Sequence, residues 1–161
     1  MDLELLKTKL ATVPELDVDK GISNSVGSLK NYRKSLYLVF KSIRFKLPML
    51  SSMLEYDEYD GLRIILHTMS QFLTTVGADS LVEASRSIEK SYLNDQLTAD
   101  VFQIYLEHLA SFVERLETGI RQVDSLLQNA PDHIHSVSNY KETKSSYDMA
   151  SIDTISMKKV M

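Results

Sequence analysis

The sequence predicts an all-α protein, and three observations carry this expectation. Only five glycines and three prolines occur in 161 residues. No segment alternates strictly between apolar and polar residues, as a half-buried strand does. Long segments instead carry apolar residues three or four positions apart, a spacing that places them on one face of an α-helix. With 43% apolar residues, the chain is long enough for one globular domain with a packed core.

The composition also excludes several classes of function. A formal net charge of −4 provides no basic field for a phosphate backbone, so we expect no nucleic-acid partner. The chain has no cysteine, which excludes disulfides, thiolate nucleophiles and cysteine-bound zinc. No apolar run approaches the roughly 18 residues that a membrane helix needs, and charged residues interrupt the start of the chain. We therefore expect a cytoplasmic protein without membrane contact.

Two short helices are expected at the N-terminus, within residues 1–27. Four apolar residues share one face of the first helix: Leu3, Leu6, Leu10 and Val13. Pro14 ends that helix, because the residue before a proline is pushed out of the helical conformation. Asp17 is suited to cap a second helical turn, which ends at Gly27. A helix this short is marginal in isolation, so we expect the first one to dock on the rest of the chain.

A long helix is expected to begin near Ser28 and to continue through Pro48. Its apolar stripe comprises Leu29, Tyr32, Leu36, Phe40, Ile43, Leu47, Leu50 and Leu54. Proline removes one backbone hydrogen bond, so a kink is expected at this position. The acidic segment EYDEYDG, residues 55–61, then forms a solvated connection whose carboxylates lie near the positive end of the next helix.

Three further helices follow this connection. The first of them buries Leu62, Ile65, Met69, Phe72, Leu73 and Val76. Gly77 ends it, and the pattern from Ser80 to Glu83 is a capping box that opens the next helix. Thr98 is then suited to cap the last helix. The apolar stripe of that helix comprises Val101, Tyr105, Leu109, Phe112, Leu116, Ile120, Val123 and Leu127.

The connections between the long helices are short, which makes consecutive helices antiparallel neighbours. Because each helix is apolar along one stripe only, the economical arrangement is an antiparallel up-and-down four-helix bundle. Residues 1–14 add an N-terminal amphipathic helix, residues 15–128 form the bundle, and residues 129–161 form a flexible or loosely docked tail rich in serine and threonine.

One histidine lies opposite the apolar stripe of its helix. An α-helix advances about 100° per residue, which puts His67 about 170° from the centre of the stripe in residues 62–76. Its outer face also carries Arg63, Ser70, Gln71 and Thr74, with Ile64 and Leu66 at the border. An exposed imidazole beside a cation and an apolar border is suited to accept a phosphoryl group and to dock a partner. By itself, this pattern also fits an ordinary surface histidine.

The sequence around His67 resembles the histidine-containing phosphotransfer (HPt) domain, whose core reads A-H-[ST]-L-K-G, followed by G-A and a helix ending in L-E. The segment LHTMSQFLTTVGADSLVEASRSIE keeps in register His67, Thr68, Met69, Gly77, Ala78, Leu81, Ala84, Ile88 and Glu89. Upstream, LDVDKGISNSVGSLKNYRKSLYLVF is similar to HPt domains at Leu16, Asp17, Gly21, Gly27, Tyr32, Leu36 and Phe40. The resemblance covers residues 15–128.

This resemblance implies a four-helix bundle and a two-component phosphorelay function. His67 would be the phospho-acceptor, taking a phosphoryl group from a receiver-domain aspartate and passing it to another receiver. The surrounding shell would comprise Arg63, Thr68, Ser70, Gln71 and Thr74, and the partner would dock on Ile64 and Leu66. The implied partner is the receiver domain of a response regulator or a hybrid histidine kinase. Magnesium is expected on that receiver, and this chain is expected to be a monomeric phosphocarrier without a cofactor or metal, not a turnover enzyme.

The sequence departs from the family motif next to His67. Ser70 replaces the lysine and Gln71 replaces the glycine of H-x-x-K-G. The lysine offers a cation to the phosphoryl oxygens, although an exposed pair of this kind is worth only about 0.2 to 1 kcal/mol. The glycine leaves clearance for the receiver, and Gln71 places a side chain in that space. Two functions are therefore open: a phosphotransfer protein, or a degenerate HPt domain that binds a kinase or receiver without carrying phosphate.

Overall fold

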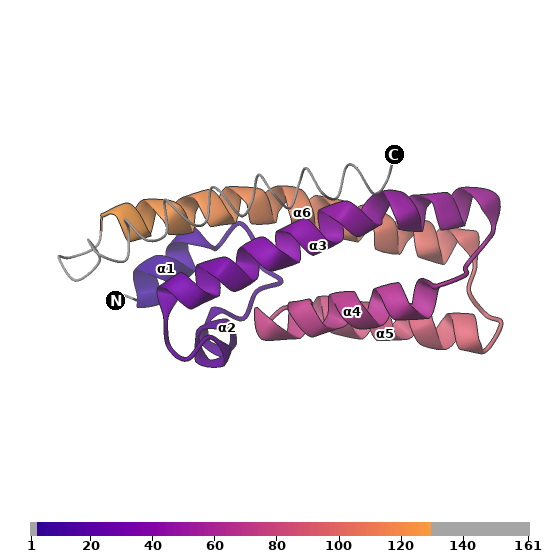
Figure 1. Cartoon of the computed structure of the whole chain (residues 1–161), viewed down its shortest axis with the longest axis horizontal. Helices are drawn as coiled ribbons and strands as arrows, with labels where there is room; N and C mark the ends of the chain where they lie inside the picture. The colour runs from indigo at the N-terminus through magenta and orange to yellow at the C-terminus, as the bar shows by residue number, and fades with distance from the viewer. Residues whose placement is uncertain (1–2, 130–161) are drawn as a thin grey trace. The chain divides into compact units, whose positions relative to one another are not determined.

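The structure, a computed structural model, describes residues 3–129. Within this range the chain is all-α, with six helices and no strand (Figure 1). The helices are α1 (Leu3–Lys9), α2 (Val18–Asn24), α3 (Leu29–Tyr56), α4 (Leu62–Thr75), α5 (Asp79–Leu93) and α6 (Ala99–Gln128). Internal contacts divide the chain into two units, Met1–Asp124 and Ser125–Met161. Apart from its first residue, the predicted tail lies outside the described residues.

Three of the predicted helix starts are confirmed by side-chain caps. The Asp17 carboxylate accepts a hydrogen bond of 3.1 Å from the backbone N–H of Lys20, at the start of α2. Ser28 caps α3 in the same way at 3.2 Å, and Thr98 caps α6 at 3.2 Å. These oxygens satisfy backbone N–H groups that have no partner inside the helix. Helix α3 also continues through Pro48, as predicted.

The predicted capping box at the start of α5 is wrong. The N-cap residue is Ala78, which makes no side-chain cap hydrogen bond, and Glu83 pairs with Arg86 instead. The helix begins earlier because Gly77 adopts a left-handed conformation, with φ of +82°, and turns the chain directly after α4. This glycine also accepts a hydrogen bond of 2.9 Å from the backbone N–H of Asp17, so the turn is joined to the start of α2.

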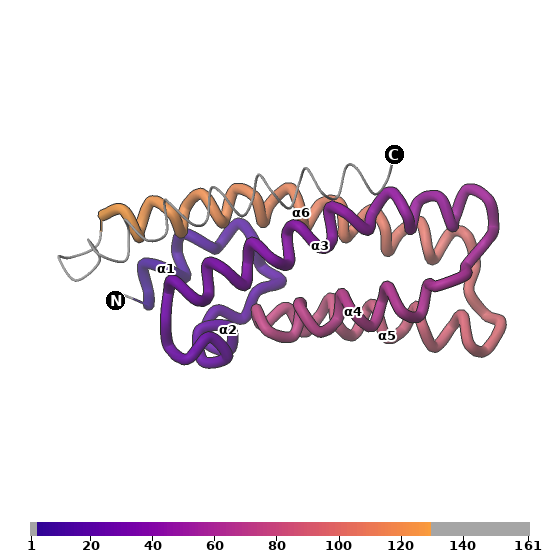
Figure 2. The backbone as a smooth tube through the Cα atoms, in the orientation of Figure 1, coloured from indigo at the N-terminus to yellow at the C-terminus, as the bar shows by residue number. Residues whose placement is uncertain are grey.

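The long helices pack along their apolar faces. Consecutive members of the series α3, α4, α5 and α6 run in opposite directions (Figure 2). Helix α4 packs against both α3 and α5. Helix α6 is joined to α5 by a buried hydrogen bond of 2.6 Å between the hydroxyls of Ser85 and Tyr105, and to α3 by an ion pair of 2.8 Å between Arg33 and Asp124. The largest fully buried side chains include Tyr32, Phe102, Phe112, Leu36, Ile43, Leu50, Leu62, Leu66, Met69 and Leu73.

The N-terminal segment docks on the rest of its unit, as predicted. Leu6, Leu10 and Val13 are buried. Gly119 of α6 makes room for this segment, because an added Cβ would come within 3.0 Å of Leu10 and 3.2 Å of Val13. No helix in residues 3–129 combines the length and the apolar character that crossing a membrane requires.

Candidate functional site

The candidate site is centred on His67, which is exposed on the outer side of α4. The opposite side of this helix faces the core through Leu62, Ile65, Leu66, Met69 and Leu73. The predicted outward direction of the imidazole is therefore confirmed. Because the ring is exposed and lies midway along a helix, a reacting group on another macromolecule has access to it.

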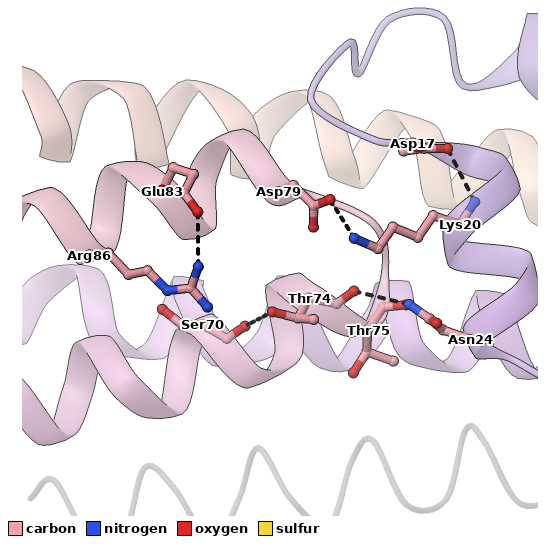
Figure 3. Close-up of polar contacts among 9 residues, drawn as sticks. All are labelled: Asp17, Lys20, Asn24, Ser70, Thr74, Thr75, Asp79, Glu83 and Arg86. Carbon is pink, nitrogen blue, oxygen red and sulfur yellow. Dashed lines mark hydrogen bonds and ion pairs between the residues drawn. The ribbon is translucent and has the colours of Figure 1, made fainter.

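A hollow of about 220 Å³ lies beside His67, between α4 and α5. Helix α4 lines it with Leu66, His67, Ser70, Gln71 and Thr74, and α5 lines it with Ser85, Arg86 and Glu89. The two helices are joined by a very short connection, so their side chains meet across the hollow. Figure 3 shows part of this arrangement, with Arg86 and Glu83 on α5 and Ser70 and Thr74 on α4.

The hydroxyl groups around His67 bond to the backbone of their own helix. Thr68 donates to the carbonyl oxygen of Ile64 at 2.9 Å, and Thr74 donates to that of Ser70 at 2.8 Å. The end of α4 is held from outside by Asn24 of α2, whose amide donates to the carbonyl oxygens of residues 74 and 75 at 3.2 and 3.3 Å (Figure 3). These bonds fix the end of α4 on which the hollow lies.

The side chain of Gln71 lies against the imidazole. Its Nε2 is 3.5 Å from Nε2 of His67, at the long limit of a hydrogen bond. An amide nitrogen can only donate, so a bond of this kind requires an unprotonated Nε2 and places the ring proton on Nδ1. The same tautomer has a lone pair on Nε2. The Gln71 side chain also occupies space next to this nitrogen.

The charged side chains at the site form ion pairs. Arg63 of α4 lies 3.8 Å from Glu89 of α5, measured from Nε to Oε2. Arg86 of α5 lies 2.8 Å from Glu83, one turn earlier on the same helix. Arg63 is not among the residues that line the hollow, whereas Arg86 is. The cation beside the hollow therefore comes from the neighbouring helix and not from the helix that carries His67.

Of the two apolar residues predicted at the border of the site, one is exposed and the other is buried in the core. Ile64 is 73% exposed, as a docking residue must be. Leu66 is only 1% exposed, so its prediction as a docking residue is wrong. Packing against both α3 and α5 widens the buried face of α4 and includes Leu66 in it. The buried face shifts away from Phe72, which is half-buried although the sequence placed it in the core.

Helix α5 lines the hollow with Ser85, Arg86 and Glu89, for which no site role was predicted from the sequence. Ser85 is 1% exposed, and its hydroxyl is bonded to Tyr105 at 2.6 Å. Burial raises the pKa of Tyr105 to about 12, so this pair stays neutral and holds α5 on α6. A helical wheel shows which face a residue occupies but not which helix lies opposite, so no signal in α5 alone indicated Arg86.

The described residues contain no group of three or more histidine, aspartate or glutamate side chains suited to hold a metal ion. Comparisons of the chain with protein-family models, with curated proteins and with solved structures found no match. The chemical groups at the site are an exposed imidazole, neighbouring hydroxyls and an amide on α4, and an arginine on α5.

Proposed function

We propose that this chain is a histidine phosphotransfer protein of a two-component phosphorelay, with His67 as the phospho-acceptor. One observation carries the proposal: the imidazole is exposed midway along α4, beside a hollow that an arginine of α5 also lines. The proposal includes the fold, in which α3, α4, α5 and α6 form the antiparallel four-helix bundle of an HPt domain. The alternating directions of these helices support it (Figure 1).

The proposed reaction is a reversible transfer between a receiver aspartate and His67. The lone pair of an imidazole nitrogen forms a bond to phosphorus while the bond from phosphorus to the aspartyl oxygen breaks, and the electron pair leaves with the carboxylate. The phosphohistidine then reacts with the aspartate of a second receiver in the reverse sense. The receiver supplies a magnesium ion, which neutralises charge on the phosphoryl oxygens. The part of this chain is to present the imidazole and to bind the phosphoryl group afterwards.

A second candidate function is supported by the contact between Gln71 and His67. The Gln71 amide lies 3.5 Å from Nε2 of the imidazole, and a side chain at this point reduces the clearance that a receiver requires. A degenerate HPt domain that binds a kinase or receiver without carrying phosphate would tolerate such a residue. This candidate shares the proposed partner, the receiver domain of a response regulator or hybrid kinase, and differs only in the chemistry.

The discriminating experiment incubates the protein with a phosphorylated receiver and measures transfer of label. The phosphocarrier proposal expects an acid-labile, alkali-stable label that is lost in His67→Gln. The matched control is His108→Gln, because His108 is also partly exposed but lies on α6 against Glu15. Receivers that bind the chain without ever labelling it would contradict phosphotransfer and support the degenerate HPt domain.

A further inference from the structure

Arg86 is the only lysine or arginine among the described residues that line the hollow beside His67. In the HPt motif, the corresponding cation is a lysine three residues after the histidine, where this chain has Ser70. Ser70 lines the same hollow from α4 but carries no charge. The cation that lines the hollow is Arg86, on the opposite side. The positive charge is therefore present at the site, but on a different helix.

The present partner of Arg86 holds it weakly. Its Nη1 lies 2.8 Å from Oε1 of Glu83, and the two side chains are 65% and 71% exposed. Exposed ion pairs of this kind contribute little stability because water and salt screen them. A phosphoryl group carries up to two negative charges and three acceptor oxygens, and a guanidinium binds such a group through two parallel hydrogen bonds. Arg86 can thus exchange Glu83 for a phosphoryl group at small cost.

The carboxylate of Glu89 also lines the hollow and would repel a phosphoryl group. Arg63 lies 3.8 Å from this carboxylate, and the Glu89 side chain is 29% exposed. The charge of Arg63 therefore offsets part of the charge of Glu89. Arg86 is left as the cation that can neutralise an added phosphoryl group.

We propose that Arg86 binds the phosphoryl oxygens of phosphorylated His67, replacing from α5 the lysine that the HPt motif carries on the histidine's own helix. This inference rests on the proposed function, because it requires that His67 accept a phosphoryl group. It concerns the phosphorylated state, in which Arg86 leaves Glu83 and turns to the phosphoryl group. In that state the phosphoryl group has a cation beside it, although Ser70 and Gln71 replace the lysine and glycine of the motif.

In the test, phosphoramidate phosphorylates His67 in the full chain directly, so that no receiver is needed. The lone pair of an imidazole nitrogen forms the new bond to phosphorus, the bond from phosphorus to the nitrogen of phosphoramidate breaks, and ammonia leaves with the imidazole proton as ammonium. Phosphorus-31 NMR then follows the phosphohistidine. The signal of His67 is the one that is absent in His67→Gln. Two quantities are measured: the rate at which the signal is lost, and the pH at which the phosphoryl group takes up its next proton.

The variants are Arg86→Gln, Arg86→Lys and the double variant Ser70→Lys with Arg86→Gln. We expect Arg86→Gln to lose the phosphoryl group about threefold to tenfold faster and to shift the titration to higher pH, because the dianion loses its cation. Arg86→Lys is expected to restore part of both effects, and Ser70→Lys to restore them in the double variant. Arg121→Gln is the matched control, because Arg121 is 73% exposed and pairs with Glu117 at the same 2.8 Å, away from the hollow.

Arg86→Gln and Arg121→Gln with the same rate and the same titration would overturn the inference, while transfer from a receiver to His67 would still support the proposed function. Absence of any His67 signal in the wild-type chain would overturn the inference as well. The double variant distinguishes loss of the positive charge from loss of the contact between Arg86 and Glu83. A lysine at position 70 restores the charge but not that contact. Circular dichroism checks that every variant is folded. If the folded double variant still shows the faster loss and the shifted titration of Arg86→Gln, that result also counts against the inference.

Discussion

The carboxylate of Glu15 is held by the guanidinium of Arg115 through two contacts, of 2.5 and 2.6 Å. Glu15 lies between α1 and α2, Arg115 lies on α6, and the Glu15 side chain is only 9% exposed. His108 adds a third contact to the same carboxylate, at 3.1 Å. This cluster ties the N-terminal segment to the last helix. It also holds a carboxylate charge in a poorly solvated place, which makes it sensitive to acid.

The stability of the protein is expected to fall with pH in the range where Glu15 takes up a proton. Hydrogen bonding to Arg115 lowers the pKa of Glu15 from 4.5 to about 2. Because the pKa is depressed in the folded state, the stabilisation is complete above the unfolded value and is lost as the pH falls from about 5 towards 2. We expect a contribution of about 3 kcal/mol to the free energy of unfolding at neutral pH.

Urea unfolding at a series of pH values measures this contribution. The variant Glu15→Gln is expected to be less stable than the wild type at neutral pH, with the difference shrinking below about pH 4. Glu117→Gln is the control, because its carboxylate forms an exposed pair with Arg121 on a single helix. Parallel pH profiles for Glu15→Gln and the wild type would show that Glu15 has no special role in acid stability.

Gly77 is expected to tolerate no side chain, for two separate reasons. Its φ of +82° strains any L-residue, and an added Cβ would collide with the backbone carbonyl of Asp17. Gly27 has a similar φ of +68° but nothing within 4 Å of an added Cβ. We expect Gly27→Ala to cost about 1 kcal/mol, the conformational part alone, and Gly77→Ala about 3 kcal/mol or more. Equal losses in thermal unfolding would mean that the contact with Asp17 relaxes without cost.

The helices were largely predictable from the sequence because their signals are local. The caps at Asp17, Ser28 and Thr98 depend on a side chain and a backbone group three residues away. The start of α5 was not predictable in this way. It depends on the left-handed conformation of Gly77, whose carbonyl oxygen accepts a hydrogen bond from the backbone N–H of Asp17, far earlier in the chain. A capping-box pattern at Ser80 is compatible with that sequence but is overridden by the tertiary contact.

The candidate site was predictable on one side only. The wheel of a single helix is enough to place His67 outward, because the direction of a side chain follows from the spacing of its apolar neighbours. It does not show that a second helix widens the buried face, which is why Leu66 was placed outside although it is 1% exposed. Arg86 belongs to that second helix, and its place beside His67 follows from the pairing of α4 with α5.

On the proposed function, introducing the HPt motif residues beside His67 is expected to speed phosphotransfer. The double variant Ser70→Lys with Gln71→Gly adds a cation one turn from His67 and removes the side chain that lies 3.5 Å from its Nε2. We expect transfer from a phosphorylated receiver to be about threefold to tenfold faster, against a loss of about 1 kcal/mol in stability from the glycine in a helix. Gln71→Ala separates the two causes, because it removes the side chain without adding charge. Unchanged transfer rates in both variants would show that neither clearance nor charge limits the reaction.

Ile64 is expected to matter for binding a receiver and Leu66 for folding, although the two residues are separated by a single position. Ile64 is 73% exposed and Leu66 is 1% exposed. Truncation of a fully buried leucine costs about 2 to 5 kcal/mol, so Leu66→Ala is expected to lower the free energy of unfolding by such an amount. Ile64→Ala is expected to leave stability within about 0.5 kcal/mol, because its side chain is already solvated.

Receiver binding, measured by calorimetry, then separates docking from general apolar exposure. On the proposed function, Ile64→Ala is expected to weaken binding, because this exposed isoleucine lies three residues before His67, on the side from which the proposed receiver would approach. Ile104→Ala is the matched control, since Ile104 is 65% exposed but lies on α6 and does not line the hollow. Equal binding by the wild type and both variants would exclude Ile64 from the docking surface. Weaker binding by Ile104→Ala alone would move that surface from α4 to α6, away from the proposed phospho-acceptor.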